Sequence, residues 1–80
     1  MVTIHRAFGF RFVLYANDHT PPHVHLIGQG GAAKVILQPD KTVRLDWSIG
    51  IARNDLRRLL QEVATRHGDL MTQWERLHDE

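Results

Sequence analysis

Residues 42–60 read TVRLDWSIGIARNDLRRLL, and the spacing of the hydrophobic residues changes within this stretch. Over residues 42–47 hydrophobic and polar residues alternate, which predicts a half-buried β-strand. From about Ala52 onward the hydrophobic residues recur every three to four positions and form a stripe on one helix face. The stripe comprises Leu56, Leu59, Leu60, Val63, Leu70, Met71, Trp74 and Leu77. A strand followed directly by an amphipathic helix predicts an α+β fold in which the helix covers a sheet.

The residues before this stretch predict the rest of the sheet. Short turns rich in Gly, Pro or Asp separate further strands, which we expect over residues 2–6, 8–16, 23–27 and 32–37. Alternation over residues 8–16 places Phe8, Phe10 and Phe12 on one face, where Trp74 of the helix is expected to pack on them.

The predicted architecture is an antiparallel β-meander of four to five strands, residues 1–47, packed by a long C-terminal helix, residues 52–79. The hydrophobic stripe keeps its phase across Gly68, so the helix is continuous or kinked at that glycine. Asn54 or Asp55 suits the start of the helix as a cap or a first-turn acid.

Length and composition limit the class of protein. A chain of 80 residues predicts one domain, residues 1–80. The absence of cysteine excludes disulfides, zinc ribbons and thiol nucleophiles. The longest hydrophobic runs are far shorter than the roughly 20 residues that cross a bilayer, and the N-terminus lacks the pattern of a signal peptide. We therefore expect a cytoplasmic protein with no membrane partner.

The charges are unevenly distributed along the chain. Residues 1–58 hold eight Lys or Arg against four Asp or Glu, whereas residues 59–80 hold two against five. Such a distribution is typical of chains that bind a polyanion or a protein of complementary charge. Arg11 in the predicted sheet and Arg53 and Arg57 in the predicted helix are the candidates for binding phosphate or a partner, and the alternative for them is a solvated surface.

The densest chemical signal is the stretch from Asp18 to His25, DHTPPHVH. His23 and His25 are two residues apart on a predicted strand, so their side chains point to one side of it while Val24 points to the other. The proline pair stiffens the preceding turn and can bring His19 or Asp18 back toward the same side. We expect replacement of either His23 or His25 to disturb this site more than the core.

Three interpretations of the stretch remain open. Three imidazoles and a carboxylate are ligands for a divalent transition metal, with His19, His23 and His25 as the candidate ligands. The same histidines, together with His67 of the helix, are candidate catalytic acid–base groups without a metal. Alternatively, the histidines only hydrogen-bond the turn and fix a corner of the fold. His5 and His78 are predicted to be surface residues.

The motif D-H-x-P-P-H-x-H at residues 18–25 resembles a family of small bacterial proteins, domain of unknown function 4160. Residues 67–75, HGDLMTQWE, are similar to the family's second signature, in which a histidine precedes a leucine and a tryptophan. The resemblance spans essentially the whole chain. It implies a toxin component of a type II toxin–antitoxin pair, with a cognate antitoxin as partner, and it implies no molecular target.

These observations lead to hypotheses from different functional classes. The first is a toxin whose working surface contains His19, His23, His25 and His67. The second is a small metal-dependent or histidine-driven nuclease or hydrolase, with RNA or another nucleic acid as partner and arginines holding phosphate. The third is a non-catalytic antitoxin or accessory protein. The sequence leaves open whether the chain is an enzyme and whether it forms a homo-oligomer.

Overall fold

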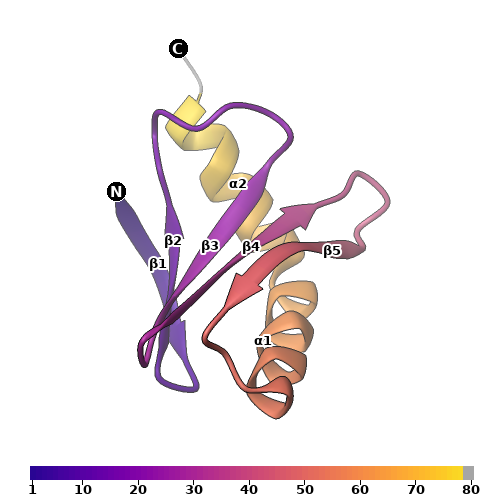
Figure 1. Ribbon diagram of the computed structural model, residues 1–80. Helices are drawn as coiled ribbons and strands as arrows, with labels where there is room; N and C mark the ends of the chain where they lie inside the picture. The colour runs from indigo at the N-terminus through magenta and orange to yellow at the C-terminus, as the bar shows by residue number, and fades with distance from the viewer. Residues whose placement is uncertain (79–80) are drawn as a thin grey trace.

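In the computed structural model, which describes residues 1–78, five strands form one antiparallel sheet in the order β1-β2-β3-β4-β5 (Figure 1). The strands are β1 Val2–Ala7, β2 Phe10–Leu14, β3 His23–Gly28, β4 Gly31–Leu37 and β5 Val43–Ile49. Each strand pairs with the next one along the chain, as in a meander. Two helices follow, α1 Arg53–Thr65 and α2 His67–His78. The expected α+β fold with a meander of up to five strands is confirmed.

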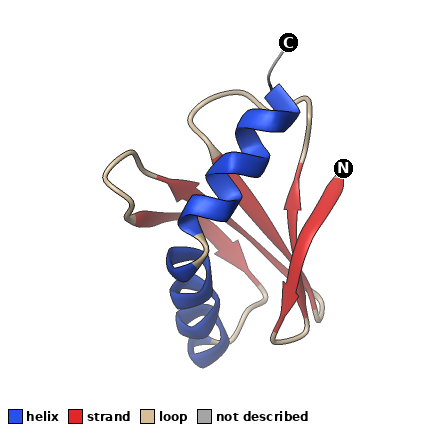
Figure 2. Cartoon of the chain, turned by 180° about the vertical axis from the view of Figure 1, so that it is seen from behind, coloured by secondary structure: helices blue, strands red, loops and turns tan. Residues whose placement is uncertain are grey.

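Both helices lie on one face of the sheet, and no helix of the described chain covers the other face (Figures 1 and 2). The core fills the space between the sheet and the helices. Its residues are Phe10, Phe12, Leu14, Val24, Leu26, Ala33, Val35, Leu37, Leu59, Val63, Leu70 and Trp74. Trp74 therefore packs with Phe10 and Phe12, as the helical stripe predicts. No described helix is long and apolar enough to span a membrane.

Phe8 does not belong to the buried face on which its spacing placed it. Phe8 and Gly9 form the two-residue turn between β1 and β2, with φ values of 56° and 81°. Positive φ at both central residues is the conformation that joins two twisted strands most directly, and Gly9 adopts it without strain. The Phe8 side chain is consequently 45% exposed, with the Arg58 guanidinium 5.9 Å from its ring centre. The prediction of a buried Phe8 is wrong because alternation does not reveal where the turn begins.

The helical region breaks at Arg66, before the glycine at which a kink was expected. Arg66 has φ −102° and ψ 16°, and it separates α1 from α2, whereas Gly68 lies inside α2. His67 is buried, and its Nε2 donates a 2.8 Å hydrogen bond to the Gln38 carbonyl after β4. This bond ties the first residue of α2 to the sheet, so a tertiary contact accompanies the break. Residue 79 of the predicted helix lies outside the described residues.

Candidate functional site

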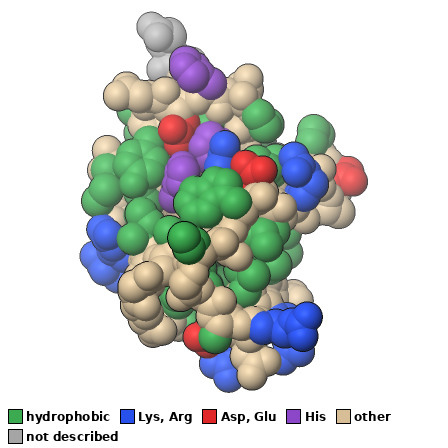
Figure 3. All heavy atoms as spheres, in the orientation of Figure 1, with side chains coloured by type: hydrophobic (Ala, Val, Ile, Leu, Met, Phe, Trp, Pro, Cys, Tyr) green, Lys and Arg blue, Asp and Glu red, His purple; other side chains and the backbone are tan. Residues whose placement is uncertain are grey.

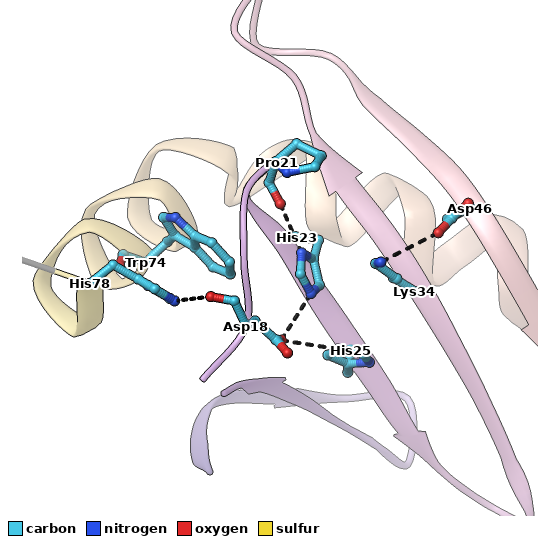
Figure 4. Close-up of polar contacts among 8 residues, drawn as sticks. All are labelled: Asp18, Pro21, His23, His25, Lys34, Asp46, Trp74 and His78. Carbon is cyan, nitrogen blue, oxygen red and sulfur yellow. Dashed lines mark hydrogen bonds and ion pairs between the residues drawn. The ribbon is translucent and has the colours of Figure 1, made fainter. Parts of the chain in front are cut away.

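Asp18, His23 and His25 come together beside the uncovered face of the sheet (Figure 4). One ligand atom from each residue lies within 4.8 Å of the others. His23 and His25 project from the same side of β3 with ring centres 5.1 Å apart, while Val24 between them is fully buried in the core. Asp18 reaches the pair from the loop between β2 and β3. We call these three residues the Asp18–His23–His25 cluster.

The loop before β3 turns Asp18 back toward the strand. The Asp18 backbone N–H donates to the Tyr15 carbonyl at 3.2 Å, which closes a tight turn after β2. The Pro22 carbonyl accepts a 2.9 Å hydrogen bond from the Leu37 N–H and so fixes the other end of the loop to β4. Because both ends of the loop are held, the Asp18 carboxylate is directed at the imidazoles.

His23 faces a hydrogen-bond acceptor at each of its two ring nitrogens. Its Nδ1 donates to the Pro21 carbonyl at 2.8 Å, and its Nε2 lies 2.9 Å from Asp18 Oδ2. The Nε2 of His25 lies 3.3 Å from the same carboxylate oxygen. A neutral imidazole carries a hydrogen on only one nitrogen. With Nδ1 donating, the Nε2 of a neutral His23 has a lone pair and no hydrogen, so a shared proton or a metal cation between Nε2 and the carboxylate would complete this contact.

The two imidazoles differ in exposure. His23 is 4% exposed and packs against the Trp74 ring, with ring centres 5.1 Å apart. His25 is partly exposed, and its ring makes an edge contact with Tyr15. Burial lowers the pKa of His25 below its usual value of 6.5, although Asp18 acts in the opposite direction. His25 is therefore mainly neutral at neutral pH, which is the form that binds a metal or accepts a proton.

Acidification is expected to destabilise the protein in part through His25. Since the pKa of His25 is lower in the folded protein than its usual value of 6.5, the unfolded chain binds this proton more readily. The stability that depends on neutral His25 is complete above about pH 6.5 and declines as the pH falls through the folded pKa. In metal-free buffer, the melting temperature should fall between about pH 7.5 and 5.5 by more in the wild type than in His25→Gln. An equal fall in both proteins would contradict the assignment.

The end of α2 braces the loop that carries Asp18. The ring of His78 stacks on Trp74 at 3.9 Å, its Nδ1 lies 2.8 Å from the Trp74 carbonyl, and its Nε2 lies 2.9 Å from the Asp18 carbonyl. His78, predicted to be a surface residue, is therefore half-buried and makes tertiary contacts. Its position four residues after Trp74, on the same helix face, is the sequence signal for this contact. His5, also predicted at the surface, is half-buried and hydrogen-bonds Glu62 at 2.8 Å.

Two of the predicted histidines lie outside the cluster. The side chain of His19 is exposed, so of the predicted ligands His19, His23 and His25 the structure brings together only His23 and His25, with Asp18 beside them. The loop turns Asp18 inward and leaves its neighbour in solvent. His67 is buried at the junction of the helices, where its Nε2 is occupied by the Gln38 carbonyl.

The arginines predicted to bind phosphate or a partner do not form one surface. Arg11 on β2 pairs across the sheet with Ile27, two residues from His25 along β3, so it shares the uncovered face with His25. Arg53 and Arg57 lie on α1, in the helical layer on the opposite side of the sheet. Arg57 lines a separate surface pocket with Phe8 and Arg58.

Comparison with known families adds one finding. Residues 9–75 match the family described as "Domain of unknown function (DUF4160)". The match includes every residue of the Asp18–His23–His25 cluster and Trp74. No curated protein and no solved structure matches the chain.

Proposed function

This chain belongs to the family described as Domain of unknown function (DUF4160), and from that premise we propose that it is the toxin of a bacterial, cytoplasmic type II toxin–antitoxin pair. In this proposal its activity is hydrolysis that depends on a divalent transition metal at the Asp18–His23–His25 cluster. A cognate antitoxin neutralises the toxin by direct contact. The toxin role is what the family resemblance carried by the D-H-x-P-P-H-x-H motif and the later histidine–tryptophan signature implies, and the metal is supported by the geometry of the cluster.

The observation that carries the metal proposal is the position of Asp18 Oδ2 between two imidazole nitrogens. It lies 2.9 Å from His23 Nε2 and 3.3 Å from His25 Nε2. Ligand atoms about 2.0–2.2 Å from a zinc-like ion lie about 3.0–3.5 Å from one another in tetrahedral or octahedral sites. Two histidines and one carboxylate on one side of an ion leave positions open for water and substrate.

The surroundings of the cluster match those of metal-binding histidines. Such histidines usually donate their second ring N–H to a carbonyl or carboxylate, which directs the lone pair of the other nitrogen at the ion. His23 does so through its 2.8 Å bond from Nδ1 to the Pro21 carbonyl. His78 in turn holds the backbone of Asp18. These contacts prepare the positions of the nitrogen of His23 and the carboxylate of Asp18.

The residues of the cluster have distinct roles in this proposal. A bound divalent cation would supply Lewis-acid chemistry by polarising a phosphoryl oxygen. Asp18 supplies negative charge, and His25 offers a neutral nitrogen because its pKa is lowered. Lys34 lies directly across from His25 on β4 and presents an ammonium group that can hold a substrate phosphate. The Nζ of Lys34 also lies 3.6 Å from Asp46 Oδ2, and this ion pair limits where the Lys34 side chain points.

Metal titration tests this proposal directly. After treatment with a chelator, the protein is titrated with Zn²⁺ or Mn²⁺ by calorimetry, and its melting temperature is recorded. We expect one ion per chain and a rise in melting temperature equivalent to about 2.7 kcal/mol when free metal is 100-fold above Kd. Asp18→Asn, which keeps the shape of the side chain and removes its charge, should weaken binding by about 100-fold or more.

His19→Ala is the matched control, because His19 lies in the same loop but is exposed and outside the cluster. It should bind the metal as the wild type does. If the wild type binds no ion, or if Asp18→Asn binds as tightly as the wild type, the metal proposal fails. The cluster would then be a metal-free histidine centre or a structural corner.

A further inference from the structure

The uncovered face carries a row of side chains that leads from the cluster to the edge of the sheet. His25 pairs with Lys34 on β4, and Lys34 pairs with Trp47 on β5. Directly paired residues of antiparallel strands point to the same face. Trp47 is therefore on the same face as His25, two strands or about 10 Å away. Trp47 is 43% exposed, although tryptophan side chains are highly buried on average.

Basic residues flank this row on both sides. The pairing of His23 with Ile36, and of Ile36 with Arg44, places the exposed Arg44 on one side. Arg11 lies on the other side, on β2, where it pairs with Ile27, two residues beyond His25 along β3. Figure 3 shows this face, where histidine and basic side chains lie among exposed hydrophobic ones. Among the described residues, two acidic side chains contact this row: Asp18 contacts His25, and Asp46 contacts Lys34.

We propose that this face binds single-stranded nucleic acid, with a base stacked on Trp47 and phosphates held by Arg44, Lys34 and Arg11. The inference rests on the proposed function, since it assigns the substrate class to the Asp18–His23–His25 cluster. Exposed aromatic rings and cations on an open sheet are the combination that binds single strands, because every base offers a flat face for stacking. A duplex keeps its bases stacked inside and cannot place one on Trp47.

The edge of the sheet argues against the simplest alternative, a second chain added to β5. The pairing of β4 with β5 is irregular between Lys34 and Val35, and the extra residue on β5 is Asp46. Bulges and charged side chains on edge strands prevent the addition of further strands. Arg44 and Asp46 supply such charges on β5. The exposure of Trp47 is better explained by a ligand on the face of the sheet.

Fluorescence anisotropy with labelled oligonucleotides tests the inference. The probes are a single-stranded RNA and a single-stranded DNA of about 12 nucleotides, and the duplex of that DNA, with EDTA present to prevent metal-dependent cleavage. We expect both single strands to bind more tightly than the duplex. Tighter binding of RNA than of DNA would identify RNA as the preferred ligand, because only RNA has the 2′-hydroxyl.

Three variants locate the binding surface. Trp47→Ala should weaken single-strand binding by about 10-fold or more, and Trp47→Phe should retain most of it. Arg44→Ala should weaken binding and lower the slope of log Kd against log salt by about 1. Arg53→Ala is the matched control, since Arg53 lies on α1 behind the sheet, and its Kd should stay within about twofold of wild type.

Each contrary outcome overturns the inference. Absence of single-strand binding by the wild type assigns the face to a protein partner instead. Equal losses in Arg53→Ala and Arg44→Ala indicate non-specific attraction, and an unchanged Kd in Trp47→Ala excludes stacking. Metal titration separates this inference from the proposed function, because Trp47→Ala should bind metal normally. A wild type that binds metal but no single strand rejects only the inference, whereas a wild type that binds single strands but no metal rejects only the metal centre.

Discussion

Replacing Trp74 by alanine is expected to lower the free energy of unfolding by about 3–5 kcal/mol. Trp74 is 4% exposed and belongs to the core between α2 and the sheet. Its ring also lies 5.1 Å from that of His23 and 3.9 Å from that of His78. Truncation therefore leaves a cavity and removes the stacking that supports the end of α2. The free energy of unfolding of a small domain is about 5–15 kcal/mol, so this loss is a large part of the total. It should be visible as a large fall in the urea concentration at the unfolding midpoint, measured by circular dichroism.

The other tryptophan of the chain is the matched control. Trp47 is 43% exposed on the uncovered face, so Trp47→Ala should change stability by no more than about 1 kcal/mol. Trp74→Phe keeps an aromatic ring in the core and should lose less than half as much stability as Trp74→Ala. If Trp74→Ala melts within a degree or two of wild type, Trp74 does not hold α2 on the sheet as described above.

The layers of the fold were predictable because they depend on periodicity. Alternation over residues 42–47 and the hydrophobic stripe that begins near Ala52 are local patterns, and the structure has strand β5 at the first and helices α1 and α2 along the second. The exposed Phe8 and the break at Arg66 were not predictable in the same way. The first depends on left-handed backbone in a two-residue turn, and the second coincides with a hydrogen bond between His67 and a residue 29 positions away.

The same distinction applies to the candidate site. The common direction of His23 and His25 follows from strand alternation alone, and the structure has it. The choice of Asp18 over His19 depends on how the loop between β2 and β3 is held at both ends, which spacing does not encode. The contact of His78 with the Asp18 carbonyl joins residues 60 positions apart. Tertiary contacts of this kind decide which residues complete a site.

The structure also changes which histidine variant best separates function from folding. The sequence predicts that replacing His23 or His25 disturbs the site more than the core. His23, however, is 4% exposed, packs on Trp74 and donates to the Pro21 carbonyl, so His23→Ala removes core packing as well as a site residue. His25 is partly exposed and makes an edge contact with Tyr15. His25→Ala is therefore the cleaner variant.

His25→Ala is expected to abolish growth arrest while leaving the protein folded. Induced expression of the wild type should prevent colony formation by bacteria, and co-expression of the cognate antitoxin should restore it. The variant removes one of two imidazole nitrogens that face the Asp18 carboxylate, and loss of such a group typically costs about 100-fold or more in activity. Its stability should stay within about 1 kcal/mol of wild type because the side chain is partly exposed.

Two further variants make the result interpretable. His19→Ala, in the exposed part of the same loop, should remain fully toxic. Val24→Asp places a charge at a position with 0% exposure between the two histidines, and it should lose toxicity together with soluble protein. Loss of toxicity in soluble His25→Ala, with toxicity kept in His19→Ala, places the activity on the uncovered face beside Asp18. Full growth arrest by His25→Ala would instead mean that the histidine pair holds the loop before β3 in place and that the toxic activity lies elsewhere on the chain.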